Sequence, residues 1–151
     1  MSRSRQPRHA KPRHLRLPKG PVALQRLRHD ARTPLNTVLG FAELIMDQGG
    51  EVVPASWLGE VKQIHTAGKR MLELSNEIFS ALPSALHQLD APALMALCRA
   101  PSSEVSTRCD RLKAKARKAG LAVTAEDLRL MSAAADTWLT RLETAFTRHC
   151  R

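Results

Sequence analysis

Aromatic side chains are nearly absent from this sequence: they make up 3% of its 151 residues, and there is no tyrosine. Strands favour aromatic and β-branched residues, so a core built largely from Leu, Ala, Val and Ile predicts packed helices rather than a β-sandwich. No apolar run approaches the ~18 residues of a membrane span, and the N-terminal segment lacks the apolar stretch of a secretory signal. We therefore expect an all-α protein with no membrane span.

Cysteine is also scarce, and its spacing matches no metal-binding or redox motif. The three cysteines form no Cys-x-x-Cys pair; they are Cys98, Cys109 and Cys150. This pattern argues against a disulfide framework and a zinc site, and it favours a reducing, cytoplasmic location. Five of the histidines also fall at no recognised metal-ligand spacing: His9, His14, His65, His87 and His149. We expect no metal and no cofactor held by the chain itself.

Acidic residues are missing from the start of the chain, where Asp30 is the first. Residues 1–28 carry nine of the lysines and arginines together with four prolines, whereas the remainder is nearly neutral. Such a segment cannot bury a core, so residues 1–21 are predicted to be a basic disordered arm. The favoured interpretation is a solubilising tail, because no aromatic residue is interleaved for base stacking. Binding of nucleic acid or of another acidic surface is the alternative.

Beyond the arm, apolar residues recur at steps of three and four, the period of one helix face. One stripe runs from Leu24 to Ile45 and a second from Trp57 to Leu82, with Gly49, Gly50 and Pro54 between them. This predicts an antiparallel helical hairpin over residues 22–82. A lone hairpin leaves its apolar stripe uncovered, so a second copy or the C-terminal helices must cover it. We favour a second copy, which gives a homodimer with a dimeric four-helix bundle.

Residues 83–151 are predicted to form additional C-terminal helices of unknown role. Pro83, Pro92 and Pro101 suggest short helical turns between breaks up to residue 102, and a longer helix is expected over 103–118. Gly120 is a suitable stop for that helix. A last helix is expected to begin near Thr124, with an apolar stripe from Leu128 to Ala145.

One segment of the first helix carries candidate chemistry. Residues 28–41 read Arg-His-Asp-Ala-Arg-Thr-Pro-Leu-Asn-Thr-Val-Leu-Gly-Phe. This run resembles the H-box, the phosphoacceptor motif in the dimerisation and phosphoacceptor domain of sensor histidine kinases. The second helix, with Ile64-His65-Thr66-Ala67-Gly68-Lys69-Arg70-Met71-Leu72, is similar to the second helix of that domain. The resemblance covers about residues 22–82, and it implies that His29 is a phosphoacceptor.

The physical chemistry of the segment agrees with this resemblance. His29 lies two residues past Leu27, about 200° around a helix, so its ring is expected to point away from the apolar stripe. A neutral imidazole is a competent nucleophile near neutral pH. The resemblance further implies that Asp30 accepts the other ring proton and that Thr33 orients water when a partner regulator is dephosphorylated. Pro34 has no N–H, which leaves the Asp30 carbonyl without its helical partner and predicts a kink.

The sequence also departs from a complete histidine kinase. It contains no Gly-x-Gly box and no phosphate-binding loop, so we expect no autonomous ATP-dependent kinase activity. Arg28 stands where the family has a small residue, and Ala31 replaces a larger apolar one. Phosphotransfer and response-regulator phosphatase activity both stay open.

Two functions are weighed on this basis. The favoured one is two-component signalling, in which His29 relays phosphate to or from the receiver domain of a response regulator, with a separate histidine kinase as a further donor. Any Mg²⁺ would come with the receiver. The alternative is a non-catalytic helical interaction protein that binds a kinase or a receiver without phosphotransfer.

Overall fold

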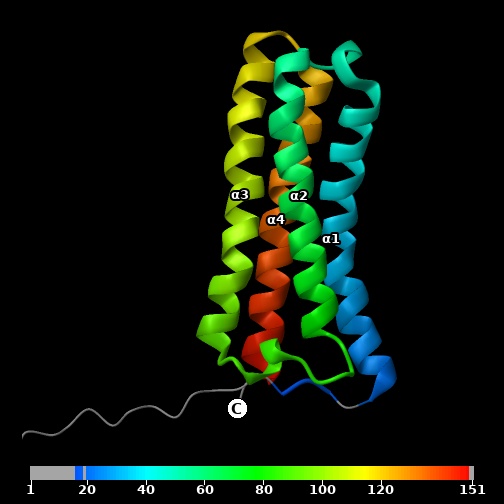
Figure 1. The fold of residues 1–151 in the computed structure, drawn as a ribbon, viewed down its shortest axis with the longest axis vertical. Helices are drawn as coiled ribbons and strands as arrows, with labels where there is room; N and C mark the ends of the chain where they lie inside the picture. The colour runs from blue at the N-terminus through cyan, green and yellow to red at the C-terminus, as the bar shows by residue number, and fades with distance from the viewer. Residues whose placement is uncertain (1–15, 19, 150–151) are drawn as a thin grey trace, which may run out of the picture.

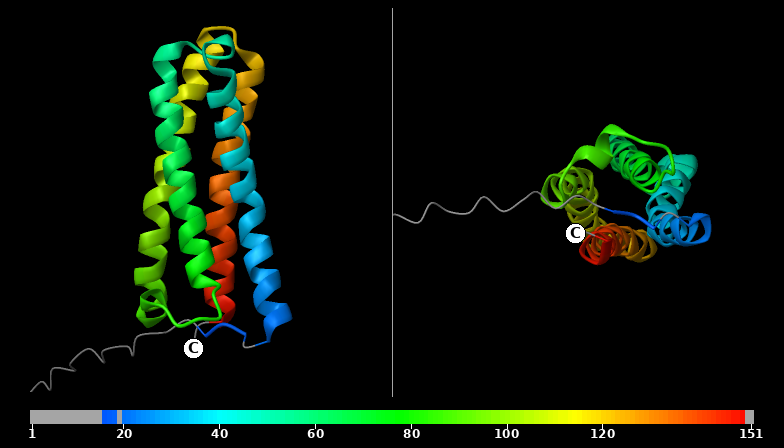
Figure 2. Two further views of the ribbon diagram at one scale, coloured as in Figure 1. Left: turned by 45° about the vertical axis from the view of Figure 1, so that its right-hand side comes forward. Right: turned by 90° about the horizontal axis from the view of Figure 1, so that it is seen from below.

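A computed structural model describes residues 16–18 and 20–149 as an elongated bundle of four helices (Figure 1). The helices are α1 (Pro21–Gln48), α2 (Leu58–Ile78), α3 (Ala91–Lys118) and α4 (Ala122–His149). Short 3-10 turns lie in the connections: η1 (Gly49–Glu51), η2 (Ala55–Trp57) and η3 (Ala85–Gln88). Each helix packs against the next along the chain, and α4 packs against α1, which closes the bundle (Figure 2).

The all-α prediction is confirmed, since the described residues contain helices and turns but no strand. None of the helices in the described ranges combines the length and the apolar composition that crossing a membrane requires. The predicted basic arm lies mostly outside the described residues, which omit 1–15 and 19. Its last residue, Pro21, already begins α1.

The apolar period of α1 and α2 produces the expected antiparallel hairpin. Seven residues of α1 are buried: Leu24, Ala31, Pro34, Leu35, Val38, Ala42 and Ile45. The helix ends at Gly49, whose φ of +57° is costly for residues with a side chain. At the α1–α2 contact, a Cβ on Gly68 would lie 3.0 Å from Leu39 Cδ2 and 3.1 Å from Val38 Cγ1. The missing side chain of Gly68 therefore lets the two helices approach closely.

Helix α3 is longer than the sequence analysis expects. Instead of short turns broken at Pro92 and Pro101, one helix runs from Ala91 to Lys118. Asp90 caps its start by accepting a 2.9 Å hydrogen bond from the Ala93 N–H, and Pro92 lies in the first turn, where no N–H is needed. Pro101 is buried inside the helix, and the packing of its apolar face outweighs the lost backbone bond.

Helix α4 begins at Ala122, so Thr124 is a buried residue of the first turn rather than its cap. The preceding turn contains Gly120 with φ of +73°, which confirms the predicted end of α3. The expected apolar stripe of α4 is confirmed by six buried residues: Leu128, Met131, Ala135, Trp138, Leu142 and Ala145.

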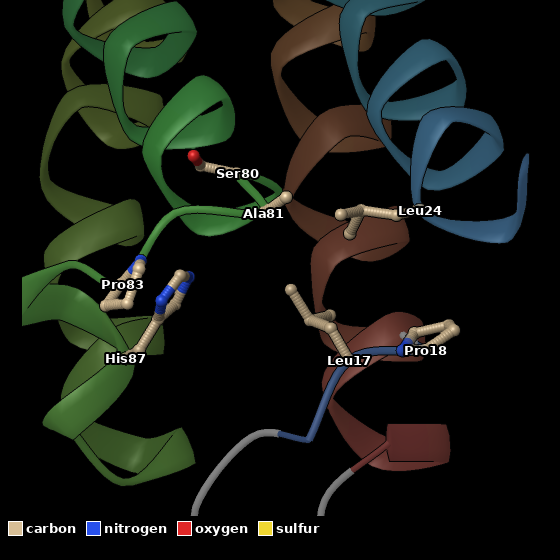
Figure 3. Close-up of a pocket in the computed structure, with 7 residues that line it drawn as sticks. All are labelled: Leu17, Pro18, Leu24, Ser80, Ala81, Pro83 and His87. Carbon is tan, nitrogen blue, oxygen red and sulfur yellow. The ribbon is translucent and has the colours of Figure 1, made fainter. Parts of the chain in front are cut away.

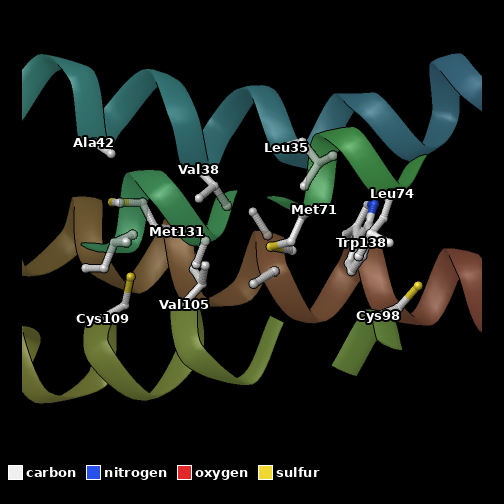
Figure 4. Packing of buried hydrophobic residues seen from close by; sticks show 14 of the residues in the cluster. Leu35, Val38, Ala42, Met71, Leu74, Cys98, Val105, Cys109, Met131 and Trp138 are labelled. Carbon is white, nitrogen blue, oxygen red and sulfur yellow. The ribbon is translucent and has the colours of Figure 1, made fainter. Parts of the chain in front are cut away.

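The apolar stripes of all four helices meet in one core (Figure 4). The largest fully buried side chain is Trp138, whose indole N–H donates a 2.7 Å hydrogen bond to the buried hydroxyl of Ser75. Helices α3 and α4 of the same chain thus cover the stripe for which the sequence analysis favours a second copy. A homodimer is therefore not needed to bury the hairpin. The predicted bundle has four helices, but one chain supplies them all.

Candidate functional site

The residues singled out by the sequence lie along the first half of α1. His29, Asp30 and Thr33 are exposed, whereas Ala31 and Pro34 between and after them are buried. The imidazole of His29 therefore belongs to the outward face of the helix, where a large partner can reach it. This placement agrees with the angular argument from Leu27 and follows from the helical period alone.

The hydroxyl of Thr33 is tied to the backbone one turn back. Its Oγ1 donates a 3.0 Å hydrogen bond to the carbonyl of His29. The hydroxyl oxygen keeps lone pairs that can accept from water, and it lies on the same outward face as His29. Among the hydrogen bonds of the described residues, none joins the Asp30 carboxylate to the His29 ring. The proposed role of Asp30 in selecting the ring tautomer stays a prediction.

Pro34 leaves one backbone carbonyl of α1 without its helical hydrogen bond, and a side chain of α4 replaces the missing donor. The Asp30 carbonyl has no helical donor, because residue 34 lacks an N–H. Arg141 of α4 supplies the missing donor: its Nη1 lies 2.6 Å from the Asp30 carbonyl oxygen. A guanidinium donor makes a stronger bond than a neutral amide. Arg141 thereby fixes the backbone next to His29, and sequence reasoning missed it because the partner lies 111 residues away.

We expect Arg141→Met to lower the free energy of unfolding by about 1 kcal/mol, since it removes this hydrogen bond and keeps the apolar stem. Urea unfolding followed by circular dichroism measures the change. The matched control is Arg129→Met, which removes a solvent-exposed pair with Glu126 on the same helix and is expected to leave the stability nearly unchanged, because water and salt screen such a pair. Equal losses in the two variants would contradict the role assigned to Arg141.

Arg28, noted in the sequence as a departure, joins α1 to the end of α2. Its Nη2 donates a 2.9 Å hydrogen bond to the carbonyl of Phe79, the residue that caps α2. A cation at a helix C-terminus is favourable for the exposed carbonyls there. The Nε of Arg28 is buried without a hydrogen-bond partner. The side chain is thus held against the protein and does not block the outward face of His29.

A groove of about 400 Å³ lies between α1 and α4, and Asp30, the residue that follows His29 in the chain, lines it. It is lined by Leu27, Asp30, Thr140, Arg141, Thr144, Ala145 and Arg148. Its two arginines and Thr144 offer donors to an acidic partner, while Asp30 is the one carboxylate in its lining. This groove is therefore suited to phosphate or to acidic side chains.

The other histidines of the described core have structural partners. His65 Nε2 lies 3.0 Å from a Glu43 carboxylate oxygen, across the α1–α2 contact. His87 donates from Nε2 to the Ile78 carbonyl at 2.9 Å. His87 also lines a mostly apolar pocket of about 500 Å³ at the lower end of the bundle, together with Leu17 and Leu24 (Figure 3). Neither histidine shares the exposed setting of His29.

No metal site is built into the described ranges, which hold no group of three or more His, Cys, Asp or Glu side chains placed to bind an ion. Cys98 and Cys109 are buried in the core, and burial raises the pKa of each thiol to about 12. Thiols with so high a pKa are protonated at neutral pH and are poor nucleophiles. Among His29, His65, His87 and these two cysteines, His29 is the one whose side chain is exposed.

The comparison with protein families identifies part of the chain. Residues 23–83 match the model of the His Kinase A (phospho-acceptor) domain, and the match covers α1 from its third residue, the following loop and all of α2. The predicted boundaries of 22–82 differ from it by one residue at each end. The searches of curated proteins and of solved structures give no match.

Proposed function

We propose that His29 accepts a phosphoryl group and exchanges it with the aspartate of a receiver domain, because residues 23–83 match the model of the His Kinase A (phospho-acceptor) domain. The family connects the chain with two-component signal transduction. The donor is a phosphorylated response regulator or a separate histidine kinase. The observation that carries this proposal is the exposed His29 on the outward face of a matched phosphoacceptor domain.

The proposed reaction needs an unprotonated ring nitrogen. In transfer from a receiver, the bond between the aspartate oxygen and phosphorus breaks as a bond between the His29 nitrogen and phosphorus forms. The electron pair returns to the receiver carboxylate, and the imidazole acquires a positive charge. We assign the stabilisation of that charge to Asp30, the next residue along, as the family resemblance implies. Any Mg²⁺ would be held by the receiver, since this proposal assigns no ion to the chain itself.

The surroundings of His29 support docking of an acidic partner. Receiver phosphorylation sites are carboxylate-based, and the α1–α4 groove, which Asp30 lines on the α1 side, presents Arg141 and Arg148. Positive charge at such a contact speeds association and falls in effect as salt increases. Thr33, one turn along the same face, is the candidate for orienting water in a phosphatase reaction.

The test is phosphate transfer from labelled receiver domains to the full chain. Acid-labile label is expected on the wild type and on His65→Gln, and none on His29→Gln. His65 is a matched control because it lies on the same hairpin but is paired with Glu43. Label that persists in His29→Gln would overturn the proposal.

Two further outcomes of this test distinguish related functions. Release of free phosphate that stops in Thr33→Ala would assign phosphatase activity to the Thr33 hydroxyl. Receiver binding without any transfer, unaffected by His29→Gln, would instead support the non-catalytic interaction protein.

A further inference from the structure

The two halves of the bundle share one pattern of burial at a fixed spacing. Pro34 inside α1 and Pro101 inside α3 are 67 positions apart, and both are buried. When residue numbers are shifted by 67, each buried residue of α1 between positions 31 and 45 corresponds to a buried residue of α3. The residues of α1 are Ala31, Leu35, Val38, Ala42 and Ile45; those of α3 are Cys98, Ser102, Val105, Cys109 and Leu112.

Helices α2 and α4 repeat the pattern at the same shift. Val61, Ile64 and Met71 correspond to Leu128, Met131 and Trp138, and all six are buried. The shift also matches identical residues, among them Ala67 with Ala134 and Phe79 with Phe146. Seen along the bundle, α1 and α3 occupy opposite corners, as do α2 and α4 (Figure 2). The two hairpins thus occupy equivalent places around the core.

We propose that the α3–α4 hairpin is a degenerate internal counterpart of α1–α2 that takes the place of a second copy, so that the protein is a monomeric bundle with one phosphoacceptor. The counterpart of His29 is Ala96, that of Asp30 is Leu97, and that of Thr33 is Ala100. All three are exposed, so the second face has an equivalent position and lacks the reacting groups. The statement about the single acceptor rests on the proposed function; the statement about the monomer does not.

Contacts between the hairpins show that α1–α2 fits α3–α4 better than a second α1–α2. The buried Ser75 hydroxyl accepts from the Trp138 indole at 2.7 Å. In a bundle of two α1–α2 hairpins, Met71 would stand at the position of Trp138. Methionine has no N–H to donate and less volume, so Ser75 would lose its partner and a void would open beside it.

The backbone next to His29 carries the same asymmetry. Arg141 donates to the Asp30 carbonyl that Pro34 leaves free. The counterpart of Arg141 is Leu74, a buried apolar residue. In a symmetric pairing, Leu74 of the other copy would face the Asp30 carbonyl and could not donate a hydrogen bond. The completed site around His29 therefore requires a residue of α4.

A third set of contacts lies between α2 and α3. The half-buried carboxylate of Glu60 is 3.1 Å from Arg111 and 3.8 Å from Arg108. The α1 counterparts of these arginines are Leu44 and Phe41, which carry no charge. In a symmetric pairing, Glu60 would lose both cations. All three sets of contacts favour the hairpin supplied within the chain.

The mass of the full chain in solution tests this proposal. Sedimentation equilibrium is expected to give the mass of one chain, 16.7 kDa, over a wide range of concentration. A particle of twice that mass would overturn the proposal, whether the hairpins pair symmetrically or exchange between chains. This measurement does not involve phosphate, so it can fail while the proposed phosphotransfer succeeds, and the reverse also holds.

A double-mutant cycle tests the contact between the hairpins directly. Ser75→Ala and Trp138→Phe are each expected to raise the unfolded fraction by about tenfold, because each leaves a buried polar group unpaired. In the Trp138→Phe background, the further change Ser75→Ala is expected to add little, since the hydroxyl has already lost its donor. Strictly additive effects would show that the two side chains do not meet in solution.

Discussion

Replacing Trp138 with alanine is expected to lower the free energy of unfolding by about 3–5 kcal/mol. Trp138 is the largest of the fully buried side chains, and it lies among Leu35, Leu74 and Cys98 in the core (Figure 4). The substitution opens a cavity and also leaves the Ser75 hydroxyl without its donor. A loss of this size is a large part of the total stability of a domain, which is typically about 5–15 kcal/mol.

Urea unfolding of Trp138→Ala measures this effect, and the second tryptophan supplies the control. Trp57 is only partly buried, in the turn before α2. Trp57→Ala is therefore expected to cost clearly less. If both variants lose the same amount, the core described for Trp138 does not hold in solution.

Separating the two hairpins is expected to abolish cooperative folding of each. A chain ending at residue 90 keeps α1 and α2 but exposes the buried stripe that runs from Leu24 to Ile45. The conformational entropy lost when the hairpin folds then costs more free energy than the burial of apolar side chains between two helices provides. Circular dichroism of this fragment is expected to show little helix at concentrations where the full chain is folded.

Mixing the two halves is the informative control for that experiment. The fragments 16–90 and 91–149 are expected to regain helix together as a one-to-one complex. The contacts of Ser75 with Trp138 and of Glu60 with Arg111 favour this mixed complex over a pair of first halves. If the first half alone forms a dimer as stable as the mixture, the differences between the hairpins do not stabilise the mixed complex.

The hairpin and its site were accessible from the sequence because they depend on local periodicity. The stripe of α1, the end at Gly49 and the outward placement of His29 all follow from the helical repeat and from glycine at a positive φ. One end of the second stripe was wrong: Leu82 is 75% exposed, because α2 ends at Ile78. Features that depend on the residues of a single helix, such as which side chains face the core, could be predicted from the sequence.

Features that depend on contacts between helices were not accessible in this way. The helix through Pro101 is stabilised by burial against α4, which outweighs the local signal of a break. Arg141 completes the backbone at Asp30 from a helix far along the chain. The correspondence of the hairpins is also hidden in the sequence, because residues such as Ser75 and Leu142 share burial but differ in chemistry.

The measurement that tests the central claim most directly is native mass spectrometry of the full chain after incubation with phosphorylated receiver domains. It reads the number of chains in a particle and the number of phosphoryl groups on it at once. The account predicts one chain carrying one phosphoryl group, which is absent in His29→Gln. A two-chain particle, a second phosphoryl group, retention of the group in His29→Gln, or no phosphoryl group with any receiver would contradict it.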